Sequence, residues 1–213
     1  MRVWKVSFVL LLAILFIPQQ SVYGNAEEIN NGKPYIEVYD AEGNLVKSYS
    51  HGDISILKEK AEESRVLLAP EVTDDTPYVH IFNNQGHLID SSVDGALEAQ
   101  QRALANLQYN AYIYYGTSFT SHVWMAGGTF FPAPAHVTVL PSQNVEGIVI
   151  RLYEKGDSAP VGTVKAGNLT GGIQIPLSSL RLGTGSYKLQ FCNANRDGSA
   201  IRLDAGTLYY QPE

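Results

Sequence analysis

Short runs of alternating apolar and polar residues fill the last part of this chain, and they restrict it to a β-rich fold. Between residues 187 and 191, the apolar side chains of Tyr187, Leu189 and Phe191 are separated by two polar ones. The same alternation occurs at residues 173–177. A period of two residues places every second side chain on one face of a strand, so each run predicts a strand with one buried face.

Strand candidates of this kind follow one another from about Gln108 to the end of the chain. Glycine, proline, asparagine and aspartate residues separate them, as is typical of tight turns. The candidates are residues 111–119, 122–125, 128–131, 136–140, 147–153, 161–164, 173–177, 186–191 and 201–210. Short strands at this spacing predict an antiparallel β-sandwich or barrel.

Tyr187 stands just inside one of these strands, after the glycine-rich corner at residues 182–185. This arrangement resembles the tyrosine corner of immunoglobulin-like sandwiches, in which the hydroxyl bonds back to upstream backbone. The resemblance implies immunoglobulin-like traits of the fold and carries no information about activity. An ordinary half-buried strand tyrosine is the alternative interpretation.

The N-terminal part contains an internal repeat with a constant offset of 43 residues. Residues 34–52 align with residues 77–95 without a gap, and both copies begin with Pro-Tyr and share their glycine positions. Each copy predicts a strand, a turn, a second strand and a helix, with Asp53 and Asp94 as candidate helix caps. We therefore expect a duplicated ββα region over residues 27–107, the alternative being two hairpins that align by chance.

Residues 1–26 have the pattern of a secretory signal peptide. Arg2 and Lys5 precede an apolar run from Val6 to Ile17, which is shorter than the about 20 residues of a membrane-spanning helix. An uncleaved anchor is the alternative. No later apolar run is long enough to cross a bilayer, so we expect no transmembrane segment after signal removal and a secreted, extracellular product. The short apolar core suits bacterial export.

Cysteine content and charge limit the remaining possibilities. The single cysteine, Cys192, rules out an intramolecular disulfide, so a secreted domain of this kind depends on its apolar core. Hydrophobic residues make up 45% of the chain, which is enough to form such a core. The formal net charge of −6 does not attract nucleic acid or anionic lipid by bulk electrostatics, and we expect neither as a partner.

The window from Tyr109 to Phe131 is unusually rich in aromatic residues. Aromatic rings exposed on a sheet can stack against the C–H faces of sugars or contact an apolar partner. The candidate ligand-binding residues are Tyr112, Tyr114 and Trp124, with His122 beside them. The alternative is that these rings belong to the core, since tyrosine is a favoured strand residue.

No motif in the sequence predicts catalysis or a strong metal site. The spacing of Asn193, Asn195, Asp197 and Asp204 imitates a calcium loop, but only two of these residues are charged and the flanks are strands. A hairpin turn around Gly198 explains the same residues, so we expect no cofactor, with weak calcium binding as the alternative. His122 is near two serines, but no nucleophile motif surrounds it.

Together these patterns predict an α+β chain with a signal peptide at residues 1–26, a duplicated ββα region at 27–107 and a β-sandwich domain at 108–213. One continuous α+β domain is the alternative. We expect a secreted, non-catalytic binding protein whose ligand is a glycan or cell-wall polymer, or else another protein. The alternatives are an exported hydrolase that uses His122, and a self-assembling or toxin-like membrane-active protein that inserts the hairpin Thr117 to Phe131.

Overall fold

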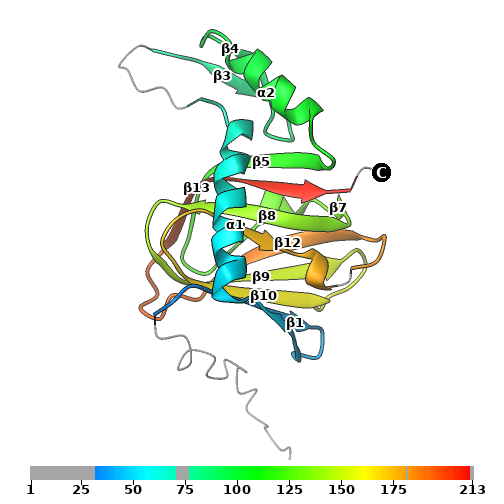
Figure 1. Ribbon diagram of the computed structural model, residues 1–213. Coiled ribbons are helices and arrows are strands. Elements are labelled where there is room, and N and C mark those ends of the chain that lie inside the picture. Colours follow the sequence, from blue (N-terminus) through cyan, green and yellow to red (C-terminus); the bar gives the residue numbers. More distant parts are fainter. Residues whose placement is uncertain (1–31, 71–76, 181, 212–213) are drawn as a thin grey trace, which may run out of the picture. The chain divides into compact units, whose positions relative to one another are not determined.

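The computed structural model describes residues 32–70, 77–180 and 182–211. Residues Gly32–Glu213 form one compact unit of mostly antiparallel β-sheet with two α-helices, α1 (His51–Ser64) and α2 (Ala96–Ala105) (Figure 1). The predicted β-rich α+β class is therefore confirmed. The predicted signal peptide, residues 1–26, lies outside the described residues.

Two sheets account for most of the described strands, and all of their pairings are antiparallel. The larger sheet has the order β2 (Leu45–Ser48), β1 (Tyr35–Asp40), β10 (Gly162–Leu169), β9 (Val145–Glu154), β12 (Ser186–Asn193) and β6 (His122–Trp124), with β7 (Phe131–Pro132) also paired to β12. The smaller sheet has the order β11 (Ile173–Pro176), β8 (Pro134–Pro141), β13 (Ile201–Tyr210) and β5 (Asn110–Phe119). The predicted antiparallel arrangement of the C-terminal half is present.

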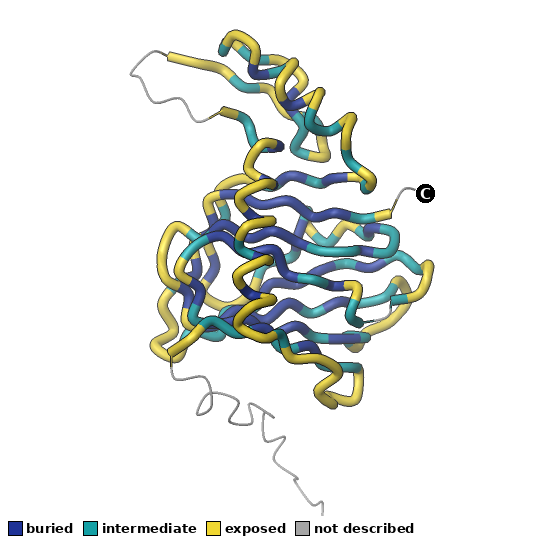
Figure 2. The backbone as a smooth tube through the Cα atoms, in the orientation of Figure 1, coloured by how far each residue is buried: buried dark blue, intermediate teal, exposed yellow. Residues whose placement is uncertain are grey.

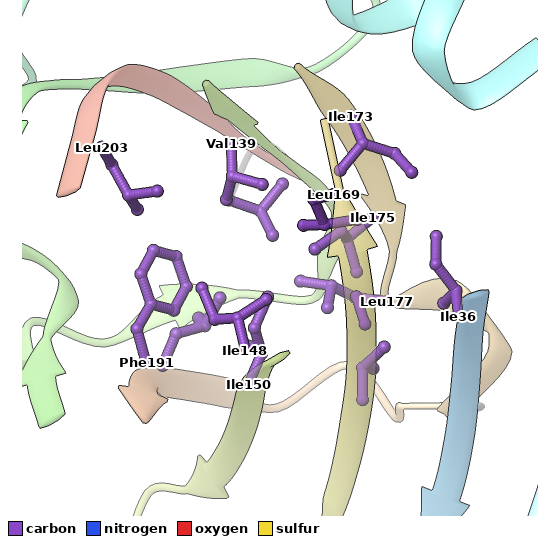
Figure 3. Close-up of a cluster of buried hydrophobic side chains, with 14 of the residues drawn as sticks. Ile36, Val139, Ile148, Ile150, Leu169, Ile173, Ile175, Leu177, Phe191 and Leu203 are labelled. Carbon is purple, nitrogen blue, oxygen red and sulfur yellow. The ribbon is translucent and has the colours of Figure 1, made fainter. Parts of the chain in front are cut away.

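The two sheets pack face to face, as in a sandwich, and the main core lies between them. Figure 3 shows Ile150 and Phe191 from the larger sheet pointing toward Val139 and Leu203 from the smaller one. All four side chains are at most 2% exposed. Burying a side chain of this size contributes about 1.5–3 kcal/mol, so the alternating residues of the sequence supply the cohesion that a disulfide cannot.

Helix α1 covers the outer face of the smaller sheet and runs across its strands (Figure 1). Its Ala61 packs against Leu140 of β8 and Ala205 of β13. The helix begins at Ser50, whose hydroxyl accepts a hydrogen bond from the Asp53 backbone in a capping box. Asp53, the expected cap, completes this capping box from the third helical position, because its carboxylate accepts a hydrogen bond from the Ser50 backbone over 3.0 Å.

The first hairpin of the repeat belongs to the larger sheet. Strand β1 pairs with β10 along its whole length, from Tyr35 opposite Gly167 to Asp40 opposite Gly162. Its inward side chains enter the main core, where Ile36 and Val38 are both 0% exposed. The boundary expected near residue 108 falls between α2 and β5, and this strand pairing crosses it. The division into a region at residues 27–107 and a domain at 108–213 stays a prediction.

The second hairpin forms a two-stranded sheet of its own, from β3 (His80–Phe82) and β4 (Leu88–Ser91). Its turn docks on the edge strand β5. The Ile113 backbone donates to the Gln85 carbonyl over 2.7 Å, and His87 Nε2 lies 2.7 Å from the Ala111 carbonyl oxygen. A Cβ on Gly86 would lie 1.9 Å from the Ile113 oxygen, so the approach requires glycine.

Helix α2 joins the second hairpin to the first copy through one buried side chain. Gln100 is 1% exposed, accepts a hydrogen bond from the Leu88 backbone and donates to the Leu67 carbonyl over 2.7 Å. The helix begins at Gly95, with φ of 74° and no side-chain cap. The prediction that Asp94 caps this helix was therefore wrong, because the chain reaches the helix through a left-handed glycine rather than an aspartate.

The two hairpins have the same backbone structure at the offset of the repeat. Each turn closes with two backbone hydrogen bonds. In the first they run from Asp40 N to Asn44 O over 3.0 Å and from Gly43 N to Asp40 O over 3.2 Å. In the second they run from Asn83 N to His87 O over 2.9 Å and from Gly86 N to Asn83 O over 3.0 Å. Gly43 and Gly86 take the same left-handed φ, 83° and 76°. The pairing registers also agree, with a bulge at Val46 in β2 and at Ile89 in β4.

Candidate functional site

The described residues form a pocket of about 710 Å³ where four separate segments meet near the start of β5. The segments are the turn of the second hairpin, the start of β5, the end of β13, and the chain from η2 (Met125–Gly128) to β7. Its lining residues are Asn84, Gln85, Asn110, Tyr112, Ala126, Thr129, Phe130, Phe131, Pro132 and Tyr210. A volume of this size is within the about 300–1,000 Å³ range of small-molecule sites.

One wall of the pocket is aromatic. The Phe131 ring lies 5.3 Å from the Tyr112 ring and 5.1 Å from the Tyr210 ring, centroid to centroid. Phe131 is only 4% exposed, and both tyrosine rings pack against it. Partial burial raises the pKa of Tyr112, which keeps its hydroxyl neutral and able to donate at physiological pH.

Carboxamides form the other part of the lining, from Asn84, Gln85 and Asn110. Each offers a carbonyl acceptor and an NH₂ donor side by side, which matches the adjacent hydroxyls of a sugar. The turn that carries Asn84 and Gln85 is fixed by the docking of Gly86 on Ile113. The position of the two amides therefore depends on a contact between segments that are distant in sequence.

Backbone strain is concentrated around this pocket. Among the described residues, the non-glycine positions with positive φ are Ala126, Ala133 and Asn168. Ala126 has φ of 47° and lines the pocket, while Ala133, with φ of 32°, follows the lining residue Pro132. Such conformations cost about 1–3 kcal/mol each and tend to occur at functional sites. Their location supports the choice of this pocket.

A second aromatic group adjoins the pocket through Phe130. On the outer face of the larger sheet, Lys188 Nζ lies 4.6 Å from the Trp124 ring centroid, 5.5 Å from that of Phe130 and 5.8 Å from that of Tyr153. The Trp124 and Tyr153 rings are 5.2 Å apart. This aromatic group, Trp124, Phe130 and Tyr153 around Lys188, gives the pocket an extension along the sheet.

The four predicted ligand-binding residues occupy three different environments. Tyr112 lines the pocket. Tyr114 shares its strand face but lies deeper, where its hydroxyl donates to the Thr138 carbonyl over 3.1 Å and burial raises its pKa. Trp124 and His122 lie on the outer face of the larger sheet. The structure therefore does not bring the four together in one site.

Sequence reasoning missed the three carboxamides and Tyr210. The repeat contained a signal for two of them, because the first turn has Ala41 and Glu42 where the second has Asn84 and Gln85. This signal is weak, because other aligned positions of the two copies also differ, for example Glu37 and His80. No comparable signal marks Asn110 or Tyr210.

The side chains of the calcium-like stretch hold a turn. Asn195 Oδ1 accepts hydrogen bonds from the backbone of Glu146 and Gly147, over 3.0 and 3.2 Å. Asp197 Oδ1 accepts one from the Ser199 backbone over 2.8 Å. Among the described residues, no group of three or more His, Cys, Asp or Glu side chains is arranged to hold a metal ion. The expectation of no cofactor, with weak calcium binding by Asn193, Asn195, Asp197 and Asp204 as the alternative, stays a prediction.

His122 is exposed, and its hydrogen-bond partner among the described residues is its neighbour Ser121, with 3.1 Å between Oγ and Nδ1. On the adjacent strand His122 stands opposite Cys192. Burial raises the pKa of the Cys192 thiol, although Arg151 opposes the effect. A thiol held in its neutral form is a poor nucleophile, so this pair does not resemble an activated catalytic dyad.

No family model, no curated protein and no solved structure matches this chain. Within residues 32–70, 77–180 and 182–211, the helices are too short or too polar to cross a membrane.

Proposed function

We propose that this protein is a secreted, non-catalytic binding protein and that its ligand is a carbohydrate held in the pocket near the start of β5. The observation that carries the proposal is the convergence of three carboxamides with the aromatic wall of Tyr112, Phe131 and Tyr210. Sugars present both kinds of surface, with hydroxyls around the rim and C–H groups on the ring face.

Binding would proceed by stacking and by hydrogen bonding at once. A sugar ring against Tyr112 would bury apolar surface, while Asn84 and Asn110 would exchange hydrogen bonds with its hydroxyls. A polymer longer than the pocket would continue over Phe130 toward Trp124 and His122. Because Lys188 already lies over the Trp124 ring, we expect this extension to contribute less than the pocket.

The extracellular location is part of the same proposal. It rests on the signal pattern of residues 1–26 and on the lack of a second long apolar run in the sequence. The negative net charge makes nucleic acid an unfavourable partner, whereas neutral glycans are unaffected by it.

Two finer features of the fold are also proposals. The matching turns, registers and bulges support a duplicated ββα unit. The contacts of the buried Tyr187 hydroxyl with the backbone of Gly183 and Gly185 support immunoglobulin-like traits.

A glycan array with the purified protein, followed by calorimetric titration, tests the function. The decisive variant combines Asn84→Ala with Gln85→Glu, which gives these two positions the residues of the first turn, Ala41 and Glu42. The first hairpin shows that this turn accepts both residues, so the fold should persist while affinity falls at least about tenfold, or about 1.4 kcal/mol.

The matched control makes the reverse change in the first turn, Ala41→Asn with Glu42→Gln, and should leave affinity unchanged. Failure of every glycan to bind, or equal affinity in the Asn84→Ala/Gln85→Glu variant, would contradict the proposal. Trp124→Ala should weaken binding of long oligosaccharides and spare short ones.

A further inference from the structure

The second hairpin has an open edge. In the part of the chain that the structure describes, β3 pairs with β4 on one side and with no strand on the other. The Val79 backbone bonds to Ser92, and that of Asn83 bonds to His87, both toward β4. Because backbone groups alternate sides along a strand, those of Tyr78, His80 and Phe82 face the open edge.

The first hairpin shows what closes such an edge. There, the equivalent strand β1 pairs with β10, and Ile36 and Val38 are 0% exposed. The equivalent side chains of the second hairpin, Val79 and Ile81, are 61% and 46% exposed. Figure 2 shows the contrast between the buried strands of the two sheets and the largely exposed second hairpin. The second copy thus keeps the apolar face of its strand but lacks the neighbouring strand.

Charge does not protect this edge. Natural edge strands commonly carry lysine, inward charges or a bulge that prevents pairing with another molecule. Residues 77–82, Pro-Tyr-Val-His-Ile-Phe, contain no charged carboxylate, lysine or arginine, and the bulge lies in the other strand at Ile89. Pro77 interrupts only the beginning of the segment.

The segment from Tyr78 to Phe82 is symmetric in chemical class about His80. An aromatic residue stands at each end, and a β-branched aliphatic residue stands on each side of the histidine. An antiparallel pair of two such segments, centred on His80, places Tyr78 opposite Phe82 and Val79 opposite Ile81 of the other copy. Aromatic and β-branched cross-strand pairs of this kind stabilise antiparallel sheets.

The hydrogen bonding of the His80 ring is incomplete. Its Nδ1 lies 2.9 Å from Ser91 Oγ, but Nε2 is buried without a hydrogen-bond partner among the described residues. Its ring lies between those of Tyr78 and Phe82, at 5.0 and 6.0 Å. His80 therefore lies in a row of rings at the centre of the segment, with the hydrogen-bonding capacity of Nε2 unused.

We infer that this edge is a self-association surface, on which β3 of one copy pairs antiparallel with β3 of a second copy about a two-fold axis at His80. The occupant is a second copy because the segment is complementary to itself and carries no like charges to oppose the pairing. The pairing joins the two two-stranded sheets into one of four strands and places Val79 beside Ile81 of the other copy. This surface is separate from the carbohydrate pocket and does not depend on it.

Sedimentation of the purified protein over about 1–500 μM tests the association. We expect a monomer–dimer equilibrium that Ile81→Lys shifts toward monomer by at least about tenfold in dissociation constant. The matched control is Val46→Lys in the first hairpin, since Val46 is 45% exposed against 46% for Ile81. The control should dimerise as the parent does. Both positions are exposed, so both variants should fold, which circular dichroism checks.

Cross-linking tests the register in a Cys192→Ala background. His80→Cys should oxidise to a disulfide-linked dimer, because position 80 faces itself across the axis. Ile81→Cys should link far more slowly, since position 81 faces Val79. A protein that stays monomeric throughout, assemblies larger than a dimer, equal loss in Ile81→Lys and Val46→Lys, or faster linking through position 81 would each overturn the inference.

Discussion

The two hairpins of this protein share a backbone and differ in their surroundings. Both have the same turn, the same left-handed glycine and the same bulge. In the first, β1 lies beside β10 and its apolar side chains are sealed in the core; in the second, β3 has an open edge and exposed apolar side chains. The turn and the bulge therefore follow from local sequence, whereas burial of the apolar side chains depends on membership of a sheet that packs against another.

The largest expected difference comes from placing a carboxylate at equivalent positions of the two strands. Val38→Asp puts an unpaired charge where the exposed fraction is 0%, and should cost more than about 4 kcal/mol or prevent folding. Ile81→Asp changes a side chain that is 46% exposed and should alter monomer stability by less than about 0.5 kcal/mol. Urea unfolding of both variants at low protein concentration measures their free energies of unfolding. Equal losses of stability would contradict the difference in burial between the two strands.

The turn glycines should differ by a smaller amount. Gly86→Ala should cost about 2–4 kcal/mol, because its Cβ would displace Ile113 and the docking hydrogen bonds. A Cβ at Gly43 would have no other atom within 4 Å. Gly43→Ala should therefore cost only the strain of a left-handed alanine, about 1 kcal/mol. Denaturant titration gives both values, and faster exchange of the Ile113 amide in Gly86→Ala alone would locate the effect.

Acid should lower the stability of the fold through His136 of β8, the strand against which α1 packs. Burial, and then Lys60 of α1, lower the pKa of His136 from 6.5 to about 4. Below pH 6.5 the unfolded chain binds a proton that the folded chain refuses, so stability should fall as the pH drops from about 6.5 to about 4.

Because the His136 ring is only partly buried, we expect a loss of about 1–2 kcal/mol over this range. The difference between parent and His136→Gln, measured by urea unfolding at each pH, isolates this group from the carboxylates. A difference that does not change between pH 7 and pH 4 would show that the histidine is not buried in its neutral form.

The smallest effect concerns the start of each helix. Ser50→Ala removes the capping box of α1 and should cost about 1 kcal/mol, whereas α2 has no side-chain cap at Gly95 to lose. Ser55→Ala is the control, since Ser55 bonds only to the His51 carbonyl on the exposed face of the same helix. Equal melting temperatures of the two variants would show that the capping box does not stabilise α1.

The strands were predictable because alternation is a local property. The predicted runs 186–191 and 201–210 correspond closely to β12 and β13, and the repeat located both hairpins. Depth in the sandwich was not predictable. Tyr112 and Tyr114 share a face of β5, yet only Tyr114 is covered by Thr138 and Phe191, because it lies further along the strand.

The pocket was predictable only in part, for a related reason. Tyr112 belonged to the aromatic window, but Asn84 and Asn110 come together only when the second turn docks on β5. That contact depends on the absence of a Cβ at Gly86. The alternation and spacing of residues do not indicate which strand a glycine will approach.

Hydrogen exchange of the outward-facing amides compares the closed edge of β1 with the open edge of β3 in one sample. The account predicts that Glu37 and Tyr39, which face β10, exchange slowly at every protein concentration. His80 and Phe82 should exchange quickly in dilute protein and become protected as concentration rises. If His80 and Phe82 are as protected as Glu37 and Tyr39 in dilute protein, or remain unprotected at high concentration, the contrast between a closed and an open hairpin is contradicted.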